Sequence, residues 1–354
     1  TARENVRLQK MEIGIAIFGA GRWGVHLVRN FLNHPHSRVI AIVDPHPEQL
    51  QAIQEHCQLD KDIALVEDWI EALELPGISA VAIATPASTH YQIISAALKK
   101  GYHVFSEKPL TLEYSESVAL CKLADQQHLQ LFVDHTYLFN PAIQTGQTIV
   151  AQGKLGELRY GYATRTHIEP VRPDVDALWD LAIHDICIFN SWLQETPVAV
   201  EANGTIWLPQ KPPQSDLVMA KLIYPSGFQA FLHLCWLNPD KQRRLGVVGS
   251  QGTLIFDETS AAQPLVIHHG HLEYLGSRWK AVDVSLEVIA TKKAEPLAQV
   301  CHEFLNCILT NTTSQISSGW VGAKLVEILC ALNNSLQQQG KAIPCDLPYS
   351  GFYN

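Results

Sequence analysis

The stretch IGIAIFGAGRWG, residues 13–24, joins an apolar run to a glycine-rich turn. The run indicates a buried β-strand, and Gly19, Gly21 and Gly24 follow it in the spacing G-x-G-x-x-G. In such a turn the first glycine allows a tight bend, the second lets backbone approach a pyrophosphate, and the third lets the following helix sit close to the sheet. Asp44 ends the second predicted strand, where a carboxylate can accept hydrogen bonds from ribose hydroxyls. The stretch therefore predicts a dinucleotide-binding domain.

Asp44 also bears on the choice of cofactor. A carboxylate at this position would repel the 2′-phosphate of NADP, and the neighbouring residues Pro45 and His46 offer no arginine to neutralise it. Arg22 argues the other way, because a guanidinium beside the turn can reach a 2′-phosphate. We expect NAD, with NADP the less favoured cofactor.

The pattern of secondary structure changes once along the chain. Short β-branched runs alternate with helical periods from residue 11 to about residue 136, which favours a parallel sheet covered on both faces. From residue 198 to about residue 274, strands follow one another through short glycine-containing turns, which is typical of antiparallel pairing. We predict an α/β Rossmann domain with a doubly wound parallel sheet over residues 1–136. An α+β domain for substrate binding and oligomerisation, with a large and mostly antiparallel sheet flanked by helices, is expected over residues 137–354.

Composition excludes several classes of protein. The net charge is −9 and no long basic run occurs, which argues against nucleic acid or an anionic membrane surface as a partner. No window contains the roughly 18 uninterrupted apolar residues that a membrane span needs. The eight cysteines form no C-x-x-C pair, so we expect reduced thiols in the cytoplasm. The 17% of charged residues leaves surface for a partner subunit, and we expect a homodimer or homotetramer.

Lys108 belongs to a second motif, SEKP at residues 106–109, at the carboxyl end of a predicted parallel strand. Doubly wound sheets bind their ligands at this edge. A lysine there can donate a hydrogen bond to a substrate hydroxyl or to its developing oxyanion. The alternative is that Lys108 is a solvated surface charge, as most lysines are.

Asp180 and His184 belong to a third motif, WDLAIHD at residues 179–185. Four residues apart on a helix, they lie on one face and can form a hydrogen-bonded pair of acid and imidazole. A carboxylate that fixes the imidazole tautomer is what a general base needs. The alternative is a surface ion pair or a satisfied core histidine. Asp185 falls on another face and is expected to orient a different group.

The three motifs in this order, followed by an antiparallel sheet domain, resemble the glucose-fructose oxidoreductase and inositol dehydrogenase family, the Gfo/Idh/MocA oxidoreductases. The resemblance covers nearly the whole chain, and Ala182 is one departure, where the family's D-x-G-x-H pattern usually has glycine. It implies reversible hydride transfer between NAD(P) and a secondary alcohol of a sugar, cyclitol or nucleotide-sugar. The stretches 135–141 and 178–185 look most like the branch that acts on nucleotide-sugars.

The resemblance also implies roles for individual residues. Lys108, Asp180 and His184 match the catalytic positions, with His184 accepting the hydroxyl proton and Lys108 stabilising the oxygen, or with these two roles exchanged. Tyr137, Asn140 and Arg165 are expected at the substrate; alternatively, Tyr137 is a helix-start aromatic and Asn140 a helix N-cap. The residues expected at the cofactor are Gly19, Gly21, Arg22, Trp23, Gly24, Asp44, Thr85, Pro86, His90, Glu107 and Lys108.

Two other functions remain open at this point. One is a reductase of a non-sugar carbonyl, imine or tetrapyrrole, and the other is a cofactor-binding regulator without turnover. A regulator would not need Lys108, Asp180 and His184 together, so their joint presence favours an enzyme. The histidines of His268-His269-Gly270-His271 are expected in a hairpin turn without neighbouring carboxylate or cysteine ligands, and we expect no metal site.

Overall fold

The fold consists of two units. The computed structural model describes residues 12–172, 174–209 and 213–345, so part of the predicted first domain, residues 1–11, lies outside the described residues. Unit 1 comprises Thr1–Thr136 and Glu295–Val326, and unit 2 comprises Tyr137–Ala294 and Glu327–Asn354.

Unit 1 contains a parallel sheet of six strands in the order β3-β2-β1-β4-β5-β6. All six residues of β1 are buried, as expected for a strand with helices on both faces. The order reverses between β1 and β4, and the carboxyl ends of the strands at such a switch point bind ligands in doubly wound sheets. The strands are β1 (Ile13–Phe18), β2 (Ser37–Val43), β3 (Ala64–Val66), β4 (Ala80–Ile83), β5 (His103–Ser106) and β6 (Leu131–Val133). The helices are α2 (Arg22–Leu32), α3 (Pro47–Cys57), α4 (Trp69–Ala72), α5 (Ala87–Lys99) and α6 (Tyr114–Gln127).

Two helices from the C-terminal part of the chain return to unit 1, whereas the sequence predicts a single second domain over residues 137–354. They are α9 (Pro296–Thr310) and the first part of α10 (Gly319–Gln337). The ring of Phe304 on α9 lies 5.5 to 6.5 Å, centroid to centroid, from three rings of unit 1, those of Phe31, Phe105 and Phe132. The apolar face of α9 is therefore part of the core of unit 1, which corrects the predicted boundary.

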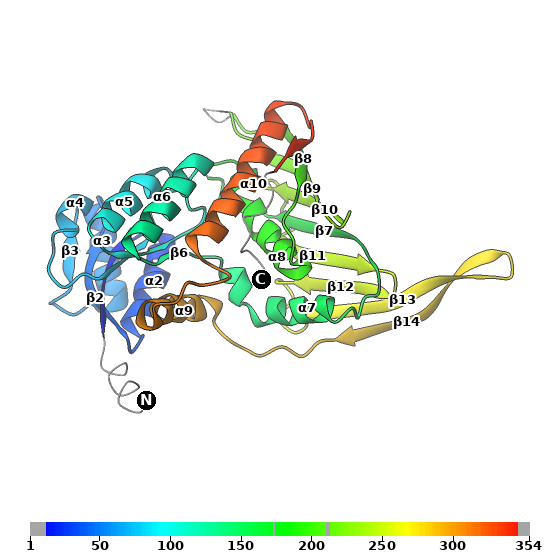
Figure 1. The fold of residues 1–354 in the computed structure, drawn as a ribbon, viewed down its shortest axis with the longest axis horizontal. Helices are drawn as coiled ribbons and strands as arrows, with labels where there is room; N and C mark the ends of the chain where they lie inside the picture. The colour runs from blue at the N-terminus through cyan, green and yellow to red at the C-terminus, as the bar shows by residue number, and fades with distance from the viewer. Residues whose placement is uncertain (1–11, 173, 210–212, 346–354) are drawn as a thin grey trace. The chain divides into compact units, whose positions relative to one another are not determined.

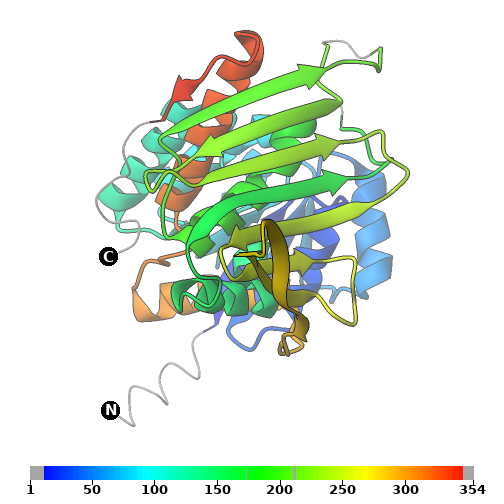
Figure 2. The same ribbon diagram turned by 90° about the vertical axis from the view of Figure 1, so that its right-hand side faces the viewer.

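Unit 2 contains a sheet of nine strands in the order β14-β13-β12-β11-β7-β10-β9-β8-β15. All neighbours are antiparallel except β7 and β10, which run parallel. Figure 2 views the face of this sheet that carries no helices, and the helices of the unit lie behind it. The strands are β7 (Leu158–Thr166), β8 (Ala199–Thr205), β9 (Leu217–Ile223), β10 (Gln229–Cys235), β11 (Gln242–Gly249), β12 (Gly252–Asp257), β13 (Leu265–Leu275), β14 (Arg278–Val288) and β15 (Ile343–Pro344). The helices are η1 (Thr136–Phe139), α7 (Pro141–Ala151), η2 (Leu178–Ala182), α8 (Ile183–Leu193) and the end of α10.

A long ribbon formed by β13 and β14 extends past the other strands of unit 2 (Figure 1). The stretch His268–His271 lies inside β13 and not in a hairpin turn, because the strand continues to Leu275 before Gly276 turns the chain. The expectation of no neighbouring carboxylate is also wrong, since Glu287 lies 2.7 Å from the His269 imidazole nitrogen. Over the described residues, no group of three or more His, Cys, Asp or Glu side chains is arranged to hold a metal ion.

The described helices and cysteines bear on two further expectations. Within the described ranges, no helix combines the length and apolar character needed to cross a membrane. All eight cysteines are free thiols. No cysteine therefore contributes a covalent link between the strands and helices described above.

Candidate active site

The glycine-rich turn has the geometry that its spacing predicts. Gly19 follows β1 with a φ of +96°, and a Cβ there would lie 2.6 Å from the carbonyl oxygen of Ala84. A Cβ on Gly24 would lie 1.8 Å from the carbonyl oxygen of Gly19, so this helix position requires glycine. Beside Gly21 there is open space, with no atom within 4 Å of an added Cβ. No side chain caps the first turn of α2, which leaves its N–H groups for a phosphate.

Asp44 is fixed beside this turn at the end of β2. Its Oδ2 accepts a hydrogen bond from the backbone N–H of Ala20 at 2.8 Å, and its Oδ1 accepts one from the N–H of His46 at 3.0 Å. Oδ1 also lies 3.0 Å from the His46 ring nitrogen Nδ1, so Oδ2 is the oxygen that keeps a lone pair for a further donor. Arg22 and Trp23 are exposed at the start of α2. The cradle at Gly21 and the held carboxylate fit the pyrophosphate and ribose of NAD.

His90 connects two of the predicted cofactor segments. Its buried ring has Nδ1 2.9 Å from the carbonyl oxygen of Pro109 and Nε2 3.0 Å from that of Thr85. His90 therefore holds the turn after β4, with Thr85 and Pro86, against the segment that contains Lys108. A direct contact between this ring and a cofactor stays a prediction.

Lys108 lies beside a set of buried titratable side chains. Glu107, Asp134 and His135 are buried at the carboxyl ends of β5 and β6. Burial and the neighbouring Asp134 raise the pKa of Glu107 well above its usual range, and burial raises that of Asp134 to about 6. Burial and the charge of Lys108 lower the pKa of His135 to about 3. The two carboxyl groups next to Lys108 can therefore hold a proton at a pH at which ordinary carboxylates have lost theirs.

Asp180 and His184 lie at the start of the most apolar helix of unit 2. Residues 178–182 form a wider π-helical turn, a feature that is frequent at functional sites, before the regular helix α8 begins. Asp180 Oδ2 accepts a hydrogen bond from the Trp236 indole at 3.2 Å, and its Oδ1 lies 3.5 Å from the Arg172 guanidinium. The His184 ring lies 5.0 Å from the Tyr137 ring, measured between centroids.

Arg165 holds Tyr137 in place. The guanidinium is 3% exposed and donates from Nε and Nη2 to the Asp185 carboxylate, at distances of 2.7 to 3.2 Å. Its Nη1 donates to the Tyr137 hydroxyl at 2.7 Å, and that hydroxyl donates to Glu258. Burial raises the pKa of Tyr137 to about 12, so the phenol keeps its proton. Asp185 thus orients a different group from the one that Asp180 faces, as the sequence predicts.

Asn140 is the N-cap of α7, and its Oδ1 accepts a hydrogen bond from the N–H of Ala142 at 2.9 Å. This is the alternative that the sequence leaves open. The carboxamide oxygen is used within the chain, and a substrate contact by Asn140 stays a prediction.

The structure gathers the predicted residues into two sets, one in each unit. The cofactor residues and Lys108 belong to unit 1, whereas Asp180, His184 and the predicted substrate residues belong to unit 2. Several side chains of the second set lie outside the sequence motifs. They are His167, Arg172, Trp236, Arg243 and Glu258. The alternation of β7 puts residues 163 and 165 on one face, and the same spacing continued past the end of the strand is the signal that points to His167.

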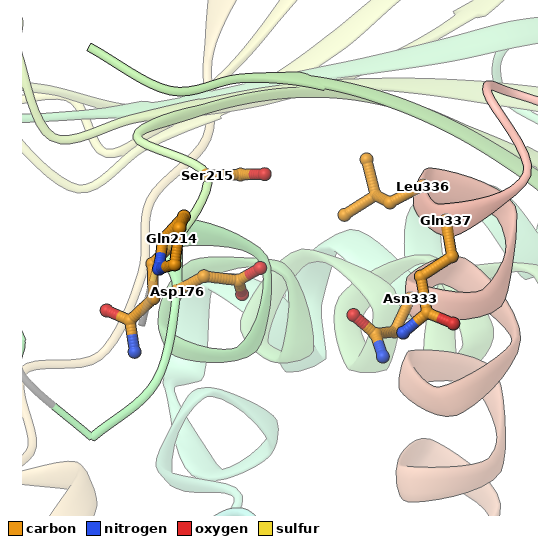
Figure 3. A pocket seen from close by; sticks show the side chains of 7 residues that line it. Asp176, Gln214, Ser215, Asn333, Leu336 and Gln337 are labelled. Atoms are coloured by element: carbon orange, nitrogen blue, oxygen red, sulfur yellow. The ribbon is translucent and has the colours of Figure 1, made fainter. Parts of the chain in front are cut away.

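Unit 2 also contains a hollow of about 370 Å³ that none of the predicted site residues lines (Figure 3). Burial raises the pKa of Asp176, which lies on its wall. The lining is mostly polar and comprises Asp176, Pro213, Gln214, Ser215, Asn333, Leu336 and Gln337.

Known proteins match both units. The family model described as "Oxidoreductase family, NAD-binding Rossmann fold" matches residues 13–135, and that described as "GFO/IDH/MocA C-terminal domain" matches residues 143–255. UDP-N-acetylglucosamine 3-dehydrogenase of Acidithiobacillus ferrooxidans is 31% identical over 246 residues, which are 68% of this chain and 72% of the relative. The NAD(+)-dependent scyllo-inositol 2-dehydrogenase of Bacillus subtilis is 24% identical over 312 residues, 85% of this chain and 88% of the relative.

Solved structures show the same fold. A structure of the Acidithiobacillus ferrooxidans dehydrogenase superposes with a TM-score of 0.73 at 25% identity, covering 92% of this chain and all of that one. The range matched by the first model contains the glycine turn, Asp44 and Lys108, and the range matched by the second contains Asp180 and His184. The chain therefore belongs to the Gfo/Idh/MocA family of NAD-binding oxidoreductases.

Proposed function

We propose that the chain transfers a hydride between NAD and a secondary alcohol or ketone of a sugar, cyclitol or nucleotide-sugar. The observation that carries the proposal is the glycine turn with its fixed Asp44, in a chain that also holds Asp180 in a π-helical turn and His184 in the helix that follows it. Two relatives are named as dehydrogenases of a nucleotide-sugar and of an inositol, which supports this substrate class.

The chain's own side chains position the cofactor and handle the proton. The turn from Gly19 to Gly24 would hold the pyrophosphate and Asp44 the ribose, and bound nicotinamide supplies the carbon that takes up hydride. His184 accepts the hydroxyl proton, and Asp180 stabilises the resulting imidazolium. Lys108 donates a hydrogen bond to the same oxygen and stabilises its developing negative charge.

Lys108 can exchange roles with His184 in this scheme. To act as the base, Lys108 must first pass its ammonium proton to a neighbour so that its amine can accept the hydroxyl proton, and the buried pair of Glu107 and Asp134, with raised pKa values, lies beside it. This pair therefore supports Lys108 as the alternative base. Asp180 is fixed by Trp236 and faces Arg172, and its part in orienting the imidazole rests on its spacing of four residues from His184.

Turnover measured at the absorbance band of reduced nicotinamide tests the proposal with a panel of sugars, cyclitols and nucleotide-sugars. His184→Ala is expected to lower turnover by about 10²- to 10⁴-fold and to leave NAD affinity nearly unchanged. Lys108→Met is expected to do comparable damage, and Asp180→Asn to lose activity while it keeps the fold and cofactor binding. His56→Ala, at an exposed histidine of α3, is the matched control.

If His184→Ala and Lys108→Met both kept near-normal turnover, the assignment of this site as a dehydrogenase centre would be wrong. Binding of NAD without turnover of any alcohol in the panel would instead favour a cofactor-binding regulator. Turnover of a carbonyl or imine outside the sugars would favour the other alternative, a reductase of the same fold.

We also propose a homodimer or homotetramer in the cytoplasm, with neither nucleic acid nor a membrane as partner. Support for the oligomer comes from the helix-free sheet face, which exposes Tyr160, Met219 and Phe231. On the ribbon, Tyr274 pairs with Trp279 and both are exposed. Because monomeric proteins rarely expose large contiguous apolar patches to water, a second copy is expected to cover these side chains.

Light scattering at micromolar concentration measures the oligomer directly, and a mass near 39.4 kDa would contradict it. Trp279→Ser is expected to weaken the association. The control is Lys280→Ser, because adjacent residues of a strand point to opposite faces. If the unaltered chain, Trp279→Ser and Lys280→Ser gave equal masses at a concentration where the oligomer partly dissociates, the ribbon would not be part of the interface.

A further inference from the structure

Three arginines of unit 2 belong to the side-chain group around Asp180 and His184, and they differ in their partners. Arg165 is neutralised by Asp185, and Arg172 by Asp174 together with Asp180. Among the described residues, no carboxylate lies within ion-pair distance of Arg243. Arg243 is therefore the one member of this trio whose charge the described part of the chain does not balance by direct contact.

Arg243 belongs to the same group by strand pairing. It lies on β11 directly opposite Arg165 on β7, so both side chains project from the same face of the sheet. Arg165 donates to the hydroxyl of Tyr137, whose ring contacts that of His184. The face that carries Arg243 is thus the face that carries the predicted substrate residues.

The guanidinium of Arg243 is held in place by neutral acceptors. Nη1 donates to the backbone oxygens of Thr166 at 3.2 Å and Gln242 at 3.1 Å, and Nη2 donates to His167 Nδ1 at 2.9 Å. Burial and the charge of Arg243 lower the pKa of His167, so this imidazole is a neutral acceptor. These bonds fix the plane of the guanidinium without cancelling its charge.

Two donors of Arg243 remain. An arginine has five N–H donors, and three are used in the bonds above. The two that are left, Nε–H among them, have no acceptor among the described residues. The side chain is half-buried and not enclosed, so a ligand can reach it.

The electrostatic surroundings of Arg243 favour an added anion. Burial and the charge of Arg165 lower the pKa of Arg243, so the cation is held in an unfavourable setting. The nearby Glu258 is exposed and accepts the hydrogen bond of Tyr137. A planar guanidinium with free donors matches the two oxygens of a carboxylate or phosphate, and such charge-assisted bonds are strong.

We propose that Arg243, held by His167, binds an oxyanion of the substrate, a carboxylate or a phosphate group, and so directs the site towards anionic sugars. This inference rests on the proposed dehydrogenase function and narrows its substrate class. The carboxylate of a sugar acid and the phosphate of a nucleotide-sugar are the two sources of the same chemistry.

Calorimetric titration of the NADH-loaded chain tests the proposal with three probes. UDP-N-acetylglucosamine supplies phosphate, glucuronate supplies a carboxylate, and myo-inositol is a neutral polyol. Arg243→Gln is expected to raise the Kd of at least one anionic probe by about 10- to 100-fold and to leave that of myo-inositol unchanged. The probe that is affected identifies the source of the oxyanion.

Arg244→Gln is the matched control, since it removes the same charge from the next residue of the strand, which is exposed on the other face. It is expected to bind all three probes as the unaltered chain does. Arg243→Lys keeps the charge but loses the planar arrangement of donors. Its Kd for the anionic probes is therefore expected to lie between those of the unaltered chain and Arg243→Gln. Thermal unfolding checks each variant, and Arg243→Lys decides the question if Arg243→Gln does not fold.

Two outcomes overturn the inference: neither anionic probe binds the unaltered chain, or Arg243→Gln and Arg244→Gln bind the anionic probes equally. Turnover separates this result from the proposed function. If Arg243→Gln oxidises an anionic sugar alcohol with the kcat/KM of the unaltered chain, the oxyanion site is wrong and the dehydrogenase stands. If no alcohol is oxidised while anion binding needs Arg243, the oxyanion site stands and the dehydrogenase assignment is wrong.

Discussion

Replacing Asp185 by asparagine is expected to destabilise unit 2 strongly. Arg165 and Asp185 are 3% and 2% exposed and are joined by three hydrogen bonds, so the pair lies out of water. The amide of Asp185→Asn keeps the shape but removes the negative charge, and the guanidinium is left buried without a counter-charge. Breaking a buried pair in this way costs about 3–5 kcal/mol. For a unit of this size, that corresponds to a melting temperature lower by roughly 6–20 °C.

Thermal and denaturant unfolding of Asp185→Asn measure this loss. The double variant Arg165→Met/Asp185→Leu removes both charges and is expected to recover most of the stability, because no unpaired ion is left. The control is Glu201→Gln, which breaks the more exposed pair of Lys221 and Glu201 in the same sheet and is expected to cost no more than about 1 kcal/mol. A loss below about 1 kcal/mol for Asp185→Asn, or a double variant weaker than the single one, would refute this reasoning.

Three further predictions concern unit 1. Asp44→Ser is expected to weaken NAD binding and to improve the relative use of NADP, as measured by kcat/KM for each cofactor. If the cofactor preference stayed the same, Asp44 would not set it, and Arg22 would be the next residue to test. Gly24→Ala is expected to lower the melting temperature, because its Cβ would lie 1.8 Å from a backbone oxygen, whereas Gly21→Ala keeps the melting temperature and loses NADH affinity in fluorescence titration. With a folded pKa of about 6, Asp134 holds a proton that the unfolded chain loses near pH 4, so its contribution to stability falls as pH rises through this window. His135, whose pKa is lowered to about 3, makes the opposite contribution; Asp134→Asn is therefore expected to steepen the rise of unfolding free energy with pH in denaturant titrations, and His135→Asn to flatten it.

The first unit could be predicted from sequence because its signals are local. The apolar run of β1, the glycine turn and Asp44 lie within one strand–helix–strand segment, and the structure places them as expected. The strand β3 has three residues, none of which is fully buried, so it is too short to show a strand pattern in the sequence. The strand β14 is not evident from the sequence either, because the left-handed Asp283 interrupts its alternation and most of its residues are exposed.

The side chains around His184 could be predicted only in part. Asp180 and His184 share one short segment, so their spacing is visible in the sequence. The pairing of Arg165 with Arg243 depends on β7 lying next to β11, and no local pattern specifies which distant strands become neighbours. The burial that makes Arg165 a positioning residue likewise arises only when Asp185 of α8 packs against the sheet.

The return of α9 to the first unit has a consequence during synthesis. Phe31, Phe105 and Phe132 are all made long before Phe304, the ring that lies against them in the finished core. At about 5–20 residues per second, a ribosome needs roughly 10 to 30 s to extend the chain from the end of β6 to this residue. During that interval the nascent Rossmann sheet displays an aromatic patch to the surrounding solution. Chaperones that hold exposed apolar segments therefore have a defined period in which to bind this chain, and it closes when α9 leaves the ribosome.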